Sequence, residues 1–212
     1  MARLTGGFAN CCFKLQNIGG GKFYFMTTNQ KLWSKTILSS YNYLEKLCNS
    51  LDKLIKDTAV NSYYSYGFKN GENSITNISN KIINLSNRKI DYINLKVLTD
   101  KVLNCMPQKQ AKLLILKFIH KIHIDKVCQL LQMTKRTAYR RIEQALGDFI
   151  EKLSEFGYTP EKLEVVYSSD PFIKSILKLV ERNNFLIEEK AEVITNDSVF
   201  NKYINELMAV TV

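Results

Sequence analysis

The side chains most suited to binding chemistry are concentrated between residues 135 and 141. Lysine outnumbers arginine four to one in this chain, yet Arg136, Arg140 and Arg141 all fall in this short stretch. A guanidinium presents a flat fork of donors that fits a guanine edge or a phosphate, which an ammonium cannot do. These residue types predict a surface that contacts DNA. Its candidate residues are Lys135, Arg136, Thr137, Tyr139, Arg140 and Arg141.

Such side chains need a rigid frame, and the flanking residues have the spacing of two short helices joined by a tight turn. Val127 and Leu131 lie four residues apart, as do Ala138 and Ile142, so each pair faces inward from its helix. Thr134 is placed to cap the second helix, because its hydroxyl can accept a hydrogen bond from a free amide. The pattern predicts a helix-turn-helix, whose second helix enters the DNA major groove; the alternative is a solvated cationic helix face. The predicted core is Val127, Cys128, Leu131, Met133, Ala138 and Ile142.

The run from Met106 to Leu146 resembles region 4 of the sigma-70 family. The similar features are Met106-Pro107 before a support helix, the apolar run Leu113 to Phe118, Val127-Cys128, and the stretch from Thr134 to Leu146. The resemblance covers residues 100–153 and implies recognition of a −35 promoter element and contact with the core of RNA polymerase. It places Lys135, Arg136, Thr137, Tyr139 and Arg140 where that family makes base and phosphate contacts.

One position departs from the family. Gln132 stands in the turn, where the family usually has glycine. A residue with a Cβ is disfavoured at positive φ, the conformation that such a turn requires. We therefore expect a turn that is strained or reshaped.

Apolar spacing predicts an all-α chain, and composition together with the resemblance to region 4 divides it into four parts. The parts are a disordered extension or a misassigned translation start (1–25), a helical hairpin with a loop at 61–74 (26–104), a region 4-like helix-turn-helix domain (105–156) and an acidic helical tail (157–212). Residues 163–167 fit either a short strand or a turn of helix. This layout is similar to that of small region 4-like regulators from bacteriophages and mobile elements of low-GC bacteria.

A heptad-like seam marks the first helix of the hairpin. Its apolar residues alternate steps of four and three, which is typical of a helix packed along one face. They are Ile37, Tyr41, Leu44, Cys48, Leu51 and Ile55. One possibility is that the seam packs against the second predicted helix, whose apolar residues lie between Ile75 and Val97. Alternatively, the seam and the face Phe172–Val180 pair two copies in a weak homodimer.

Positive charge is unevenly placed along the chain. The formal net charge is +10. Residues 101–150 carry ten basic and three acidic side chains, whereas residues 151–212 carry seven and eleven. The densest positive charge thus coincides with the predicted helix-turn-helix, as a phosphate-binding surface requires.

No residue set indicates catalysis, a metal or a cofactor. His120 and His123 have no ligand partners at suitable spacing, and no nucleophile–base arrangement is present. The five cysteines form no Cys-x-x-Cys pair, which favours reduced thiols in a cytoplasm. No apolar run could span a membrane, and no secretory signal is recognisable. We expect a cytoplasmic protein that is not an enzyme and does not bind a membrane.

The expected function is sequence-specific binding of double-stranded DNA to regulate transcription. Two alternatives remain open. One is a minimal sigma factor that recruits RNA polymerase, and the other is a protein-interaction scaffold built on a degenerate helix-turn-helix.

Overall fold

The computed structural model describes residues 26–65, 72–185 and 196–209, and in this part of the chain it contains helices and no strand. The all-α prediction is therefore confirmed for these residues. The elements are α1 (Thr28–Ser65), α2 (Glu72–Cys105), α3 (Gln108–Leu114), the π-helix η1 (Ile115–Ile119), α4 (Ile124–Leu130), α5 (Lys135–Glu155), α6 (Pro160–Tyr167), α7 (Pro171–Phe185) and α8 (Asn196–Ala209). The predicted extension at 1–25 lies outside the described residues.

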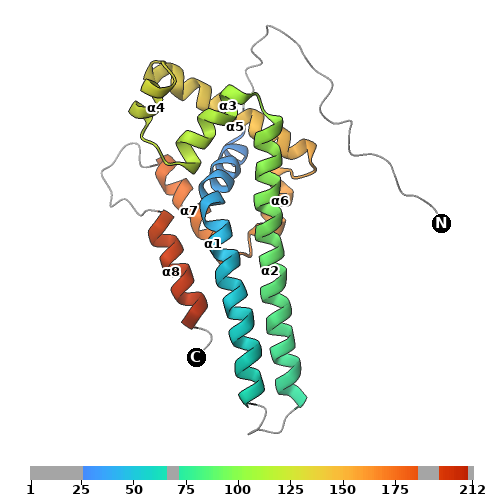
Figure 1. Ribbon diagram of the computed structural model, residues 1–212. Coiled ribbons are helices and arrows are strands. Elements are labelled where there is room, and N and C mark those ends of the chain that lie inside the picture. The colour runs from blue at the N-terminus through green and yellow to red at the C-terminus, as the bar shows by residue number, and fades with distance from the viewer. Residues whose placement is uncertain (1–25, 66–71, 186–195, 210–212) are drawn as a thin grey trace, which may run out of the picture.

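The helices α1 and α2 form a long antiparallel hairpin, which is the stalk of the molecule (Figure 1). The predicted loop at 61–74 is too long, because residues 61–65 belong to α1 and residues 72–74 to α2. Neither short stretch contains Gly or Pro, so continuing the helix costs little backbone free energy. Residues 66–71, between the two helices, lie outside the described residues.

The apolar seam of α1 is buried inside the molecule. Ile37, Leu44 and Leu51 are at most 1% exposed, and α1 contacts α2, α5, α6, α7 and α8. The face Phe172–Val180 is also covered, since Phe172, Ile173 and Ile176 belong to the same core. Both surfaces are therefore largely covered within the chain, and nothing in the described part of the structure supports the expected homodimer through them. Most of their apolar area is buried by packing within the chain.

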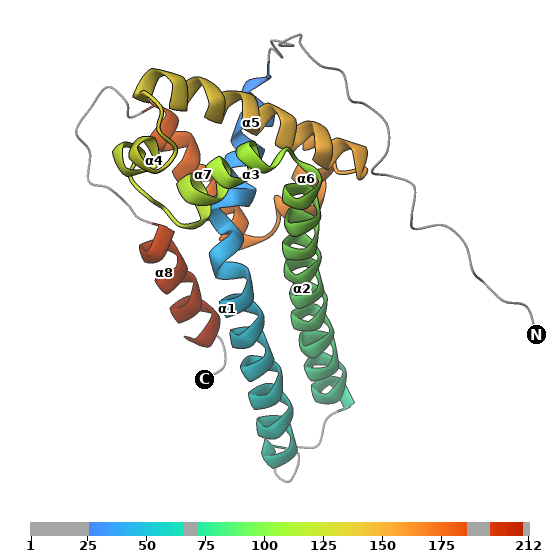
Figure 2. The ribbon, with the colours of Figure 1, turned by 45° about the horizontal axis from the view of Figure 1, so that its top comes forward.

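The helices α3 to α5 form the head of the molecule, at the end of the hairpin where α1 begins and α2 ends (Figure 2). Helix α5 lies across this end. Ser34 of α1 faces it: its Oγ donates to the Gln30 carbonyl at 2.8 Å and also lies 3.4 Å from the Leu146 carbonyl oxygen, so the two backbones approach closely. Lys31 and Glu143 form an ion pair at 2.7 Å across the same contact.

The support helix that the sequence predicts from Gln108 to His120 is only partly α-helical. After Leu114 it widens into the π-helix, in which the His120 amide donates to the Ile115 carbonyl at 2.8 Å. The Asn42 side chain of α1 donates to the carbonyl of Ile119, the last residue of the π-helix. The backbone then turns through Lys121, whose φ is +53°. A tertiary partner thus replaces the regular helical pattern at this point.

The residues after 157 are packed helices. Residues 163–167, which fit strand or helix from the sequence, belong to α6; Thr159 caps this helix by accepting from the Lys162 amide at 3.4 Å. Helices α7 and α8 lie beside α1 (Figure 1). Aromatic rings join the three helices, with 5.1–6.3 Å between the centroids of contacting rings. They belong to Tyr43, Phe172, Phe200 and Tyr203.

A buried polar cluster fixes α2 to the C-terminal helices. The Tyr92 hydroxyl donates to Asp170 Oδ2 at 2.7 Å and lies 3.2 Å from the Tyr203 hydroxyl. Asp170 Oδ1 accepts from the Ile173 amide at 2.9 Å and so caps α7. The Arg88 Nε lies 3.6 Å from the same carboxylate. Burial, together with the charge of Asp170, raises the pKa of Tyr92 far above its usual range, so this hydroxyl stays a donor.

We predict that Tyr92→Phe lowers the free energy of unfolding by about 1–3 kcal/mol, because a buried carboxylate loses one of its donors. Tyr41→Phe is the matched control: it removes a tyrosine–aspartate hydrogen bond of 2.6 Å, to Asp100, at a half-buried position of the same hairpin. Its loss should be about 1 kcal/mol or less, because water can replace the donor. Urea denaturation followed by circular dichroism measures both. Equal losses would contradict the role assigned to burial.

Candidate nucleic-acid interface

A tight turn of Leu131 to Thr134 joins α4 to α5. The Met133 amide donates to the Cys128 carbonyl at 3.0 Å, and the Gln132 amide donates to the Gln129 carbonyl at 3.3 Å. This pair of hydrogen bonds is the Schellman pattern for ending a helix. It requires positive φ at the residue between Leu131 and Met133, and Gln132 has a φ of +49°. The residue that stands where region 4 usually has glycine thus has the left-handed backbone conformation.

The end of α5 repeats the same motif with the residue that suits it. The Tyr158 amide donates to the Leu153 carbonyl at 3.0 Å and the Gly157 amide to the Ser154 carbonyl at 2.9 Å. Gly157 has a φ of +81°. Because glycine has no Cβ, it adopts this conformation without the steric cost that Gln132 bears.

The apolar residues of this unit form its inner frame. Val127, Cys128, Ala138 and Ile142 are buried, whereas Leu131 and Met133 are half-buried at the turn. Thr134 caps α5, since its Oγ1 accepts from the Thr137 amide at 3.3 Å. The Oγ1 atoms of Thr134 and Thr137 also lie 2.9 Å apart. The frame and the cap therefore fix the direction in which the first two turns of α5 point their remaining side chains.

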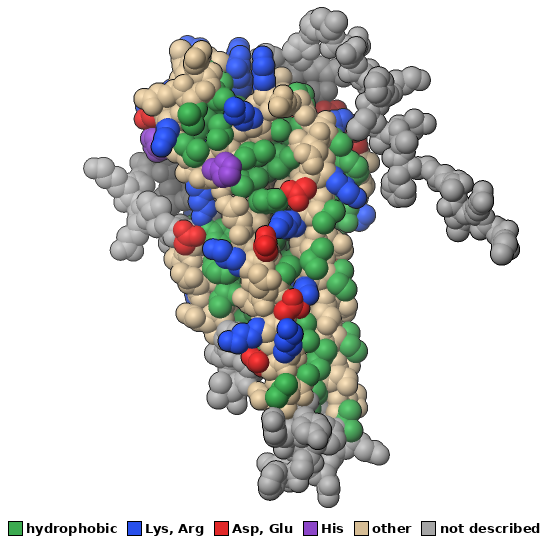
Figure 3. Space-filling view, viewed as in Figure 1, with side chains coloured by type: hydrophobic (Ala, Val, Ile, Leu, Met, Phe, Trp, Pro, Cys, Tyr) green, Lys and Arg blue, Asp and Glu red, His purple; other side chains and the backbone are tan. Residues whose placement is uncertain are grey.

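Those remaining side chains are the cationic and hydrogen-bonding ones. Lys135, Arg136, Arg140 and Arg141 are exposed, Tyr139 is 54% exposed and Thr137 is partly exposed. Arg136 and Arg140 lie four residues apart, on the side of α5 opposite Ala138 and Ile142. Lys and Arg side chains gather at this end of the molecule in the space-filling view (Figure 3). The structure thus brings all six sequence-predicted residues onto one end of α5.

One of the six is already engaged, which the sequence did not reveal. Lys135 Nζ lies 2.6 Å from Asp125 Oδ1, across the turn on α4. The hydrogen bond between them lowers the pKa of Asp125 and raises the pKa of Lys135. Asp125 therefore places a negative charge beside the candidate interface and offsets one of its positive charges.

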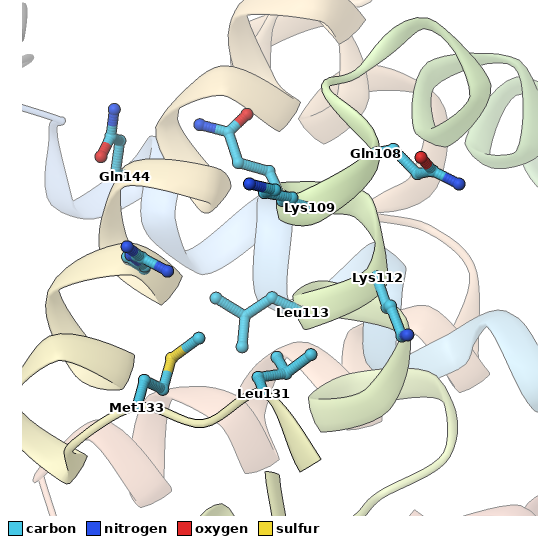
Figure 4. A pocket seen from close by; sticks show the side chains of 9 residues that line it. Gln108, Lys109, Lys112, Leu113, Leu131, Met133 and Gln144 are labelled. Atoms are coloured by element: carbon cyan, nitrogen blue, oxygen red, sulfur yellow. The ribbon is translucent and has the colours of Figure 1, made fainter. Parts of the chain in front are cut away.

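A groove beside α5 adds two further cations that the sequence analysis did not assign. Its volume is about 580 Å³, and Leu113, Leu131 and Met133 face one another across its floor (Figure 4). Lys109 and Lys112 of α3 and Arg141 of α5 also line it. The signal in the sequence was the i, i+3 spacing of the two lysines, opposite buried Ala111 and Leu114. Whether these two lysines lie beside the cations of α5 depends on where α3 packs, and the spacing of the lysines does not predict that.

Other chemistry is not indicated in the described residues. They contain no cluster of three or more acidic, cysteine or histidine side chains able to hold a metal. His123 instead caps α4, with its Nδ1 accepting from the Asp125 amide at 3.5 Å. Among the described helices, none combines the length and apolar character needed to cross a membrane.

Comparisons of the chain with protein-family models, curated proteins and solved structures give no match. The resemblance to region 4 therefore rests on the residues quoted for it above.

We predict that Gln132→Gly raises the free energy of unfolding by about 1 kcal/mol, because it removes the steric cost of a Cβ at positive φ. Gly157→Ala, at the same position of the same motif, should lower it by about 1 kcal/mol for the converse reason. Thermal and urea denaturation measure both variants. A destabilised Gln132→Gly variant would show that the Gln132 side chain stabilises the turn by more than its backbone conformation costs.

Proposed function

We propose that this protein binds duplex DNA in a sequence-specific manner and regulates transcription through α4 and α5, used as a region 4-like helix-turn-helix. The observation that carries the proposal is the exposed cluster of arginines at the start of α5, held on a buried frame. Cations scattered over a surface need no buried frame, whereas a helix that must present a few side chains to base edges needs one.

The dimensions of the first two turns of α5 fit this role. Residues 135–141 extend about 9 Å along the helix, and the major groove is about 12 Å wide. Arg136 and Arg140 lie on the outermost side and are the candidates for bidentate contacts to guanine. Thr137 and Tyr139 flank them with hydroxyl groups. Glu143 lies on the same side, but its ion pair with Lys31 offsets a charge that would repel phosphate.

The cations beside α5 suit the phosphate backbone. Arg141, Lys109 and Lys112 surround the groove between α3 and α5, so they lie to one side of the arginines that face the bases. Phosphate contacts fix the register of a protein on DNA without reading its sequence. We assign these three residues to that role.

The resemblance to region 4 keeps RNA polymerase as a candidate partner. Run-off transcription with purified core polymerase distinguishes the classes. Initiation by this protein alone would make it a minimal sigma factor. Binding of a protein partner without salt-sensitive affinity for DNA would make it an interaction scaffold.

We predict that the double variant Arg136→Ala/Arg140→Ala loses specific binding, at about 1–3 kcal/mol for each bidentate contact removed. The measurement is fluorescence anisotropy with a duplex selected by the parent protein from a random pool. Arg182→Ala, an exposed arginine of α7, is the matched control and should bind as the parent does. If the double variant binds the selected duplex as tightly as the parent, the proposed function is wrong.

The ion pair between Asp125 and Lys135 predicts a variant that binds DNA more tightly than the parent does. Asp125→Asn should tighten binding to any duplex, because Lys135 becomes available to a phosphate and a repulsive charge is removed. The slope of log K against log salt concentration should become steeper by about one. Glu164→Gln, an exposed carboxylate on α6, controls for the change in net charge. An equal gain with Glu164→Gln would assign the effect to net charge alone.

A further inference from the structure

Helix α2 carries apolar residues on two opposite faces. The inner face, with Leu85 and Tyr92, is buried in the core. On the outer face, Ile83 is 54% exposed, Ile90 52% and Val97 46%. Hydrophobic side chains accordingly follow the outer edge of α2 in the space-filling view (Figure 3). A helix that is apolar on both sides is expected to pack on both, yet no described helix covers the outer one.

The outer face has the spacing of a two-stranded coiled coil. Ile83, Ile90 and Val97 are seven residues apart, and asparagines stand between them at steps of three and four. We call the whole set the outer seam. It consists of Asn80, Ile83, Asn87, Ile90, Asn94 and Val97, and its three asparagines are exposed. A strict seven-residue repeat keeps a seam facing one partner helix along its length.

We propose that the outer seam binds the outer seam of a second copy of this chain, in parallel and in register. The asparagines select this partner. A side-chain amide both donates and accepts, so each asparagine can pair with its own copy across the two-fold axis. An antiparallel pairing in coiled-coil register would set Asn87 or Asn94 against isoleucine and leave a buried amide unpaired, which is costly. A single asparagine in such a seam is known to specify register at a cost in stability, and this seam has three.

The charges along α2 permit the pairing. Its cations between residues 80 and 97 lie on other faces of the helix, and they are Lys81, Arg88, Lys89 and Lys96. Lys89 and Lys96 are moreover ion-paired to α1, through Asp52 at 2.5 Å and Glu45 at 2.7 Å. The positions that flank the seam are mostly small or neutral, with Asp91 as the one charge among residues 79, 84, 86, 91 and 93. The seam extends about 26 Å, and two copies meet along it without repulsion between cations.

The pairing does not depend on the proposed function, but it suits it. A two-fold axis along the stalk brings both heads to the same end. Two copies of α5 would then face DNA together, as recognition of an inverted repeat requires.

The first test is the mass of the full chain in solution at tens of micromolar, measured by light scattering. The parent should show twice the chain mass of 24.5 kDa, and Ile90→Asp should show the chain mass itself with an unchanged helical circular dichroism spectrum. Ile75→Asp is the matched control, since Ile75 is 49% exposed on another face of α2, and it should remain dimeric. A monomeric parent overturns the proposal. So does an Ile90→Asp variant that stays dimeric.

The second test fixes the orientation. In a parallel, in-register pair the two copies of position 80 face each other, within reach of a disulfide. The full-length Asn80→Cys variant should therefore form a covalent dimer on mild oxidation, identified by the linked peptides in mass spectrometry, and Ile75→Cys should not. In an antiparallel pair centred on Ile90 the two positions would be about 30 Å apart. A dimer without the Asn80→Cys cross-link would overturn the parallel register.

Discussion

Burial of α1 on several sides at once is the constraint on which the rest of the structure depends. Ordering a helix of 38 residues costs about 1–2 kcal/mol per residue in backbone entropy, and contact along a single stripe offsets only part of it. Here α1 contacts α2 along the stalk, α5 at one end, and α6 to α8 along another side. Small hydroxyl side chains make this crowding possible. Ser34, Thr36 and Ser40 are buried, and each donates to a carbonyl one turn earlier in α1.

The position of the head follows from that arrangement. Ser34, Lys31 and Asn42 of α1 reach the Leu146 carbonyl, Glu143 and the Ile119 carbonyl respectively. These contacts hold both α5 and the end of the π-helix. Lys121, after the π-helix, lies over the Tyr43 ring of α1 at 4.8 Å and 3.4 Å from Asp197 of α8. The candidate interface on α5 is therefore held in place by contacts between residues up to 112 positions apart in the sequence, and such support from rigid elements is what a precise binding surface requires.

Electrostatics at the head reflects local pairing more than net charge. The chain carries ten excess positive charges, but two acidic residues near the start of α5 are each paired with one lysine. Asp125 engages Lys135, and Glu143 engages Lys31. The arginines at 136, 140 and 141 are exposed and take no part in the ion pairs found among the described residues. Three exposed guanidinium groups outside these ion pairs therefore lie together at one end of this strongly basic chain.

The sequence by itself determined the features that depend on neighbours within one or two helical turns. These features are local. They are the apolar pairs at i, i+4, the threonine before the charged helix and Gln132 in the turn, and their spacing predicts helical structure from residues 127 to 142 without reference to the rest of the chain.

Only the tertiary structure decided the features in which distant segments compete for the same atoms or surface. Asn42 takes the Ile119 carbonyl at the end of the π-helix, and α3 brings Lys109 and Lys112 beside Arg141. Packing also chose between two apolar stripes of similar spacing: it buried the seam of α1 and left the outer seam of α2 exposed. Periodicity shows that a helix has an apolar face, but which face is covered depends on the other helices that reach it.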